Sequence, residues 1–195
     1  IILTQKGCLW AEAALPVRVR TQTGKALAFH PTPKGCGLPR LKASNSEFMI
    51  DIEQLGWEPR TVGELDHRLL KAPHVKLRSC AQGSTGDVVY AVDLRINPPN
   101  VTFLSSTEMH SFEHFLLAGF QKYMPQNFIS IGLMGCQTGF YLVLFNEGRA
   151  QTILDVYEKI LNDILTASEV PYANIAQCRK KKNHSLELAR QLAQR

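Results

Sequence analysis

The residues from Ser105 to Tyr123, SSTEMHSFEHFLLAGFQKY, decide the fold because they carry a complete helix signal. Ser105 with Glu108 three residues later has the spacing of a capping box, which marks the start of a helix. Apolar residues then recur at helical spacing, at Met109, Phe112, Leu116, Phe120 and Tyr123. We therefore predict a helix over about 106–123 with one face against a hydrophobic core.

A β-hairpin is predicted before this helix. Val75 and Leu77 alternate with polar neighbours, residues 83–86 supply a glycine-containing turn, and a second alternating run extends from Val88 to Ile96. Two consecutive prolines then end the second strand, because proline cannot donate to a strand ladder.

Two further strands and two helices are predicted after it. Apolar runs at 128–131 and 140–145 flank the glycine-rich segment 132–139, a helical stripe covers 153–164, and a last helix covers 186–194. The order β-β-α-β-β-α-α predicts an α+β fold, in which an antiparallel β-sheet has helices packed on one face as a two-layer sandwich.

The first part of the chain has a different texture. Residues 1–60 contain scattered prolines and glycines without sustained periodicity. Such a segment is typical of an irregular N-terminal extension, to which we assign no role. We expect the folded domain to occupy residues 61–195.

Composition excludes several classes of partner. The 195 residues are 45% hydrophobic and 20% charged, which is ordinary for a chain with one sizeable core. The net charge of +5 is spread along the chain except for the run at 179–182, which we interpret as a solvated face rather than a nucleic-acid site.

Cysteine usage and hydropathy indicate the compartment. The five cysteines are an odd number at wide spacing, which favours a reducing, cytoplasmic location over a disulfide scaffold. No apolar run reaches the length that crosses a bilayer, and the first residues do not resemble a signal peptide. We expect no membrane partner.

The predicted helix 106–123 carries the strongest chemical signal. His110 and His114 are four residues apart, so both imidazoles can bind one ion from the same helix face. Glu113 adds a carboxylate that can move protons, in the H-x-x-E-H order. The alternative is a polar, solvent-facing stripe, but only six histidines occur in the chain, so this pairing favours a metal site.

Two protein ligands are too few, because catalytic metal sites usually supply three and leave one position for water or substrate. The candidates for the third ligand are Cys136, Cys178, His67, His184, Glu147, Glu158 and Glu187. Spacing alone does not choose among them. In the alternative interpretation neither residue binds a metal: Cys178 is a small buried side chain and His184 is a surface histidine.

Cys136 is a second candidate for chemistry. It lies between Gly135 and Gly139 on the connection between two predicted strands, where its thiol can be exposed. A nearby cation would lower the pKa of such a thiol, which can then act as an acid, a base or a nucleophile. An ordinary hairpin, whose glycines serve only the turn, is an equally good interpretation of the residues alone.

Three segments stand out together: Met109 to His114, Met134 to Tyr141, and Gln177-Cys178. Shorter segments accompany them: Leu65-Asp66-His67, Lys71-Ala72-Pro73, Gly86-Asp87, Asp93-Leu94-Arg95 and Pro99-Asn100. In this order, from about Leu65 to the C-terminus, they jointly resemble the S-ribosylhomocysteine lyase family, the LuxS autoinducer-2 synthases.

The resemblance implies a metal centre and an assembly. His110, His114 and Cys178 would ligate one divalent metal per subunit, with water fourth. Fe²⁺ is the metal that the resemblance favours, with Zn²⁺ or Co²⁺ as substitutes. It also implies a homodimer with active sites at the subunit interface, and it makes residues 61–195 the catalytic domain.

The resemblance further implies a reaction and its residues. Glu113 and Cys136 would be the acid/base pair, while His67 and Arg95 would hold the sugar end of S-ribosylhomocysteine. The expected products are homocysteine and 4,5-dihydroxy-2,3-pentanedione, the precursor of autoinducer-2. They would form by carbonyl migration and β-elimination, with the metal acting as a Lewis acid.

Departures from the family pattern keep two alternatives open. Val62, Ser130, Gly132, Leu133 and Arg179 replace the usual residues near the substrate rather than at the metal. They raise the alternative of a catalytically degenerate copy. The other alternative is an inverzincin-type metallopeptidase, which shares the H-x-x-E-H helix but takes a downstream Glu as third ligand.

Overall fold

A computed structural model describes residues 19–20, 26–27, 50–178 and 182–195. Strand β1 (Val19–Arg20) pairs with β2 (Ala26–Leu27) as a short antiparallel ladder within the first compact unit of the chain. The other residues of that unit lie outside the described part, and the expectation of an irregular extension stays a prediction for them.

The second compact unit, Phe48–Arg195, contains a four-stranded antiparallel sheet. Its strands, in spatial order, are β3 (His74–Gln82), β4 (Val88–Arg95), β6 (Gly139–Phe145) and β5 (Phe128–Leu133). The predicted hairpin is the β3–β4 pair, and the two later apolar runs form the β5–β6 pair. The predicted antiparallel sheet is confirmed.

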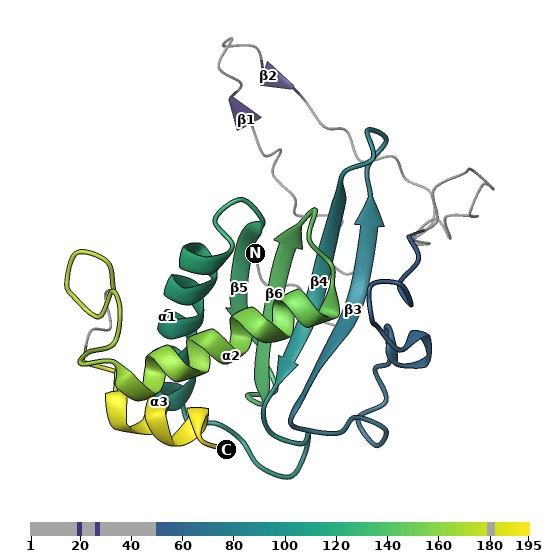
Figure 1. Cartoon of the computed structure of the whole chain (residues 1–195). Helices are drawn as coiled ribbons and strands as arrows, with labels where there is room; N and C mark the ends of the chain where they lie inside the picture. Colours follow the sequence, from purple (N-terminus) through teal and green to yellow (C-terminus); the bar gives the residue numbers. More distant parts are fainter. Residues whose placement is uncertain (1–18, 21–25, 28–49, 179–181) are drawn as a thin grey trace, which may run out of the picture. The chain divides into compact units, whose positions relative to one another are not determined.

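Three helices pack against the sheet: α1 (Ser106–Tyr123), α2 (Ala150–Thr166) and α3 (Leu186–Ala193). Figure 1 shows α2 running across the strands, with α1 beside β5 and α3 below. The α+β class is therefore confirmed. Within the described residues, no helix combines the length and the apolar character needed to cross a bilayer.

Helix α1 begins as its sequence predicts. The Ser105 hydroxyl accepts a hydrogen bond from the Glu108 backbone N–H at 3.2 Å, and the Glu108 carboxylate accepts from the Ser105 N–H at 2.7 Å. This reciprocal pair satisfies two donors that a helix start leaves free. Phe112, Leu116 and Phe120 of the same helix are fully buried, which fixes which face of α1 meets the core.

Strand register sets the two faces of the sheet. On the core face, Val92 of β4 lies opposite Leu142 of β6, and neither side chain is exposed. Because side chains alternate along a strand, Asp93 and Arg95 point to the other face, and both are buried there as well. Charged groups that are buried need partners, so this end of β4 is a candidate for chemistry.

Residues 50–61 contact the same unit. Trp57 is buried, and its indole N–H donates a hydrogen bond to the Gly148 carbonyl at 2.6 Å. The Ala150 N–H, at the start of α2, donates to the Leu55 carbonyl at 2.8 Å. A short 3-10 helix, η1 (Pro59–Thr61), follows. The division of the chain at residue 60 stays a prediction, and these contacts favour a start of the compact unit before it.

Candidate metal centre

Four nitrogen and sulfur donors gather beside α1. His110, His114, Cys178 and His184 each offer one ligand atom, and these atoms all lie within 4.8 Å of one another. The Cys178 sulfur is 3.4 Å from Nε2 of His110 and 3.5 Å from Nε2 of His184. Sequence spacing alone brings His110 and His114 together. The fold of the C-terminal segment brings the other two donors to them.

Backbone carbonyls orient the two helix histidines. Nδ1 of His110 lies 3.2 Å from the Asn183 carbonyl oxygen, and Nδ1 of His114 lies 2.7 Å from that of Pro171. A carbonyl only accepts, so in the neutral form of each ring Nδ1 carries the proton and Nε2 keeps its lone pair for a metal. This arrangement is typical of histidines that bind metals, whose remaining N–H is usually held by a second partner.

The structure separates the candidates for the third ligand. Cys178 and His184 reach the histidine pair, whereas Glu147 is engaged in an ion pair with Arg149. Glu158 and Glu187 are exposed on α2 and α3. Within the described residues, the histidine pair is therefore completed by sulfur and nitrogen rather than by a carboxylate.

The donor set fits a divalent transition metal. Burial, together with the charges of His110 and His114, lowers the pKa of His184 to about 4, so its imidazole is neutral near pH 7. Neutral imidazole and thiolate are the ligands that zinc and ferrous iron accept, while carboxylate and carbonyl oxygens suit magnesium or calcium. These residues form a His/Cys metal-binding cluster.

Cys136 belongs to a second cluster, at the end of β4. Nη1 of Arg95 donates to the Thr138 hydroxyl oxygen at 2.7 Å, and that oxygen lies 3.0 Å from the Cys136 sulfur. Nη1 of Arg95 is itself 3.8 Å from the sulfur. Burial acts to raise the pKa of Cys136, but the hydrogen bonds from Thr138 and Arg95 outweigh it and lower that pKa below its ordinary value.

Strand pairing positions this second cluster. Gly139 of β6 lies directly opposite Arg95 of β4, and a side chain at Gly139 would collide with the β4 backbone at Leu94 and Arg95. The Thr138 carbonyl then accepts from the Ile96 N–H at 2.9 Å. Gly139 therefore serves a close approach of two strands and not only a turn.

Glu113 lies on α1 between its two histidine neighbours and is half-buried. Burial raises the pKa of its carboxyl group, although the charge of His114 acts in the opposite direction. A cavity of about 410 Å³ is lined by His110 and Met109 of α1 and by Gly135 and Gln137, the neighbours of Cys136. A sugar-sized molecule fits such a space.

Of the remaining predicted residues, Leu133 lines the same cavity as His110 and Gly135. His67 is exposed on the segment before β3, and no hydrogen bond or ion pair within the described residues joins it to either cluster. Of the departures, Val62 is half-buried, and Ser130 and Leu133 are exposed on β5 beside the half-buried Gly132. Arg179 lies outside the described residues.

Three residues of the site were missed by the sequence interpretation. Thr138 links Arg95 to Cys136, while Ser111 and Asn183 join α1 to the C-terminal segment. Their residue types gave no indication of a role, because each is a common polar residue. Their positions in the sequence, close to a candidate cysteine or histidine, were the one feature that could have identified them.

An α+β domain in which one helix and the C-terminal segment gather three imidazoles and a cysteine sulfur is typical of a small metalloenzyme. The family model described as S-Ribosylhomocysteinase (LuxS) matches residues 62–195. S-ribosylhomocysteine lyase of Halobacillus halophilus is 43% identical over 129 residues, which are 66% of this chain and 84% of that protein. The enzyme of the same name from Clostridium perfringens is 44% identical over 127 residues, 65% of this chain and 83% of that protein. The chain belongs to the S-ribosylhomocysteinase (LuxS) family.

Proposed function

We propose that this chain is a carbon–sulfur lyase that cleaves the thioether of S-ribosylhomocysteine to homocysteine and 4,5-dihydroxy-2,3-pentanedione. The observation that carries the proposal is the gathering of His110, His114 and Cys178 in a chain of this family. The thiol of Cys136, whose pKa is lowered, and the carboxyl of Glu113, whose pKa is raised, add two candidate groups for acid–base chemistry.

The reaction needs groups of this kind. The sulfur leaves from a carbon that is not beside a carbonyl, so the carbonyl first moves from the first to the third carbon of the sugar. Each move takes a proton from one carbon and returns one to its neighbour. Removal of a further proton beside the new carbonyl then breaks the carbon–sulfur bond, and the sulfur leaves as the homocysteine thiol. No net oxidation occurs.

The electrostatic environments of Cys136 and Glu113 suit them to different proton transfers. The Cys136 thiolate takes the carbon-bound protons, and Arg95 holds that thiolate in its charged form. Glu113, protonated more readily than an exposed carboxyl, supplies protons to oxygens and to the neighbouring carbon. His110, His114 and Cys178 would hold a divalent ion, which would supply Lewis acidity toward the carbonyl and hydroxyl oxygens.

Other parts of the proposal rest on the family resemblance. We propose Fe²⁺ as the resident metal, with Zn²⁺ or Co²⁺ as substitutes, because the donors suit all three. Arg95 and His67 are proposed to hold the sugar, within a catalytic domain at 61–195. A homodimer with active sites at its interface, and a reducing, cytoplasmic location, complete the proposal.

The alternatives have less support. An inverzincin-type peptidase takes a downstream Glu as third ligand, whereas here a cysteine and a histidine lie at the pair. A catalytically degenerate copy would keep the metal cluster and lose turnover, so activity separates it from the lyase.

Release of homocysteine tests the proposal. Metal-loaded, reduced protein is mixed with S-ribosylhomocysteine, and free thiol is measured over time. Cys136→Ala and Glu113→Gln each lower kcat by about 100-fold or more, as loss of a general acid or base does, and both retain one metal per chain.

Cys80→Ala is the matched control, because Cys80 is also a half-buried free thiol but lies on β3 outside both clusters. It retains turnover. If the unaltered, metal-loaded protein releases no homocysteine, the lyase proposal is wrong and the degenerate copy is correct.

A further inference from the structure

We propose that Leu133 determines which thioethers this site accepts, by forming an apolar wall for the chain attached to the substrate sulfur. The site then takes S-ribosyl thioethers with an uncharged alkyl chain as well as S-ribosylhomocysteine. This assignment rests on the proposed function, because it concerns the substrate of the same site. The same carbon–sulfur bond breaks, the sulfur keeps the electron pair and takes a proton, and the chain leaves as an alkanethiol.

Leu133 lies on the face of the sheet that meets the core. It ends β5, and strand pairing places it opposite Phe140 of β6, whose side chain is fully buried. Directly opposed residues share a face, and so does Ile131, which is 9% exposed. Leu133 is nevertheless 44% exposed. The core does not cover it because it lines the cavity of about 410 Å³, together with Met109 and His110 of α1.

The neighbours of Leu133 leave room for a ligand against it. A methyl group at Gly132 or at Gly135 would meet no atom within 4 Å. Met134, between Leu133 and Gly135, is buried. Leu133 is therefore the exposed apolar side chain of residues 132–135, and an exposed apolar wall in a cavity favours an apolar group of a ligand.

The cavity offers little to a charged group. Among the described residues that line it, His110 alone has an ionisable side chain, and His110 belongs to the metal cluster. The Asn183 amide is used within the protein: its oxygen accepts from the Thr107 hydroxyl at 2.6 Å, and its nitrogen donates to the Ser106 hydroxyl oxygen at 3.1 Å. An ammonium or carboxylate of a substrate finds no oppositely charged side chain among these residues, so water solvates it better.

The reacting groups line the same cavity and fix which part the sulfur chain occupies. His110 belongs to the metal cluster, and Gly135 and Gln137 flank Cys136. A sugar whose oxygens face the metal and whose carbons face Cys136 fills that part of the cavity. The chain on sulfur then extends along the remaining lining, where Leu133 is the exposed apolar group. Contact between the two removes apolar surface of both from water, which stabilises binding.

Thiol release from two substrates tests the range of substrates. S-ribosylbutanethiol has a sulfur chain as long as that of S-ribosylhomocysteine but lacks the ammonium and the carboxylate. Metal-loaded, reduced protein is expected to cleave both, with kcat/KM values within about tenfold of each other, as for small differences in an apolar pocket. A site that pairs with the charged groups rejects the neutral substrate by about 10⁴-fold, so a preference for S-ribosylhomocysteine above about tenfold overturns the inference.

Leu133→Asn tests the residue itself, because asparagine has nearly the shape of leucine but a polar surface. The kcat/KM for S-ribosylbutanethiol falls by about tenfold relative to that for S-ribosylhomocysteine. Ile129→Asn is the matched control, since Ile129 is also an exposed apolar residue of β5 but does not line the cavity. The ratio of the two kcat/KM values is unchanged in this control. An unchanged ratio in Leu133→Asn overturns the role of Leu133.

Binding separates this inference from turnover. Calorimetric titration of zinc-loaded Cys136→Ala with S-ribosylbutanethiol measures a Kd without cleavage. Addition of Leu133→Asn to that variant raises the Kd by about tenfold, and addition of Ile129→Asn leaves it unchanged. Equal Kd values for the two double variants overturn the apolar contact, whatever the activity assay gives. Release of homocysteine without butanethiol defeats this inference alone, and release of neither thiol, with the expected Kd values, defeats the proposed function alone.

Discussion

At the scale of single residues, Thr138 is the group through which a buried arginine acts on a cysteine. Its hydroxyl accepts from Arg95 and can therefore donate its own proton to the Cys136 sulfur. Such a donor stabilises the thiolate over the thiol. The pKa of Cys136 is low for this reason, despite the partial burial that opposes it.

Thr138→Val removes this donor while keeping the side-chain shape. The pKa of Cys136 then rises, so less thiolate is present at pH 7 and alkylation by iodoacetamide slows by about fivefold, the equivalent of one hydrogen bond. The full pH profile of alkylation moves to higher pH. Thr138→Ser keeps the hydroxyl and is the control, with a profile like that of the unaltered protein. Equal profiles for the Val and Ser variants would contradict the role of Thr138.

The sequence predicted those site residues whose proximity follows from local geometry. His110 and His114 lie together because a helix repeats every 3.6 residues, so their spacing was sufficient. Cys178 and His110 are 68 positions apart, and Arg95 and Cys136 are 41 apart. No periodicity relates such pairs. Their approach depends on how α3 docks on α1 and on the register of β4 with β6.

At the scale of elements, Gly139 sets the distance between β4 and β6 where the thiol cluster begins. A methyl group there would meet the carbonyl oxygen of Leu94 and the Cα of Arg95, and backbone atoms cannot rotate away. Gly135, four residues earlier in the loop before β6, has open space around it. The two glycines therefore make a matched pair.

Gly139→Ala is expected to destabilise the protein by about 1–3 kcal/mol, as overpacking of a tight contact does. It also shifts Arg95 away from Cys136, so the thiol loses part of its reactivity. Gly135→Ala changes the free energy of unfolding by less than about 0.5 kcal/mol, as at an open surface position. Urea unfolding measures both, and equal stability of the two variants would contradict the close approach at Gly139.

Elements were predictable where both their start signals and their periodicity are local. Helix α1 was predicted from its capping box and apolar stripe, and it spans the predicted residues. Strand β5 runs to Leu133, two residues beyond its predicted end, because pairing with Phe140 extends the ladder past the apolar run. The register shift between Phe128 and Ser130 also depends on the partner strand and left no mark in the sequence.

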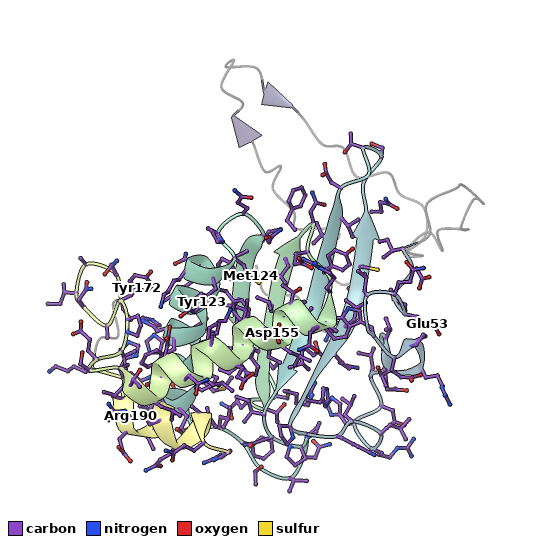
Figure 2. The ribbon with its side chains drawn as sticks, in the orientation of Figure 1. Glu53, Tyr123, Met124, Asp155, Tyr172 and Arg190 are labelled. Atoms are coloured by element: carbon purple, nitrogen blue, oxygen red, sulfur yellow. The ribbon has the colours of Figure 1, made fainter. Side chains whose placement is uncertain are left out.

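At the scale of the whole molecule, the metal cluster joins parts of the chain that are distant in sequence. His110 and His114 come from α1, whereas Cys178 and His184 come from the segment between α2 and α3. Figure 2 labels Tyr172 in that segment, and its hydroxyl donates to the Gln121 side chain of α1 at 3.2 Å. Tyr172 has a φ of +58°, a costly conformation for a tyrosine. Hydrogen bonds to Thr107, Ser111 and Gln121 of α1 hold the described part of the segment, and a bound metal would add a further attachment.

Metal binding should therefore stabilise the folded chain as a whole. An ion that binds the folded state alone, at about 1,000 times its Kd, contributes about 4 kcal/mol. For a chain of this size that raises Tm by about 10 °C, and a chelator reverses the gain. Scanning calorimetry measures the Tm of the metal-loaded and of the chelated protein.

Cys178→Ser weakens the metal cluster without changing α1, so the Tm of that variant responds much less to the same metal. Because thiolate and imidazole ligands must lose their protons to bind, the difference in Tm between metal-loaded and chelated protein shrinks as pH falls toward 5. If the chelated and metal-loaded proteins melt together at pH 7.5, the ligands do not link α1 to the C-terminal segment.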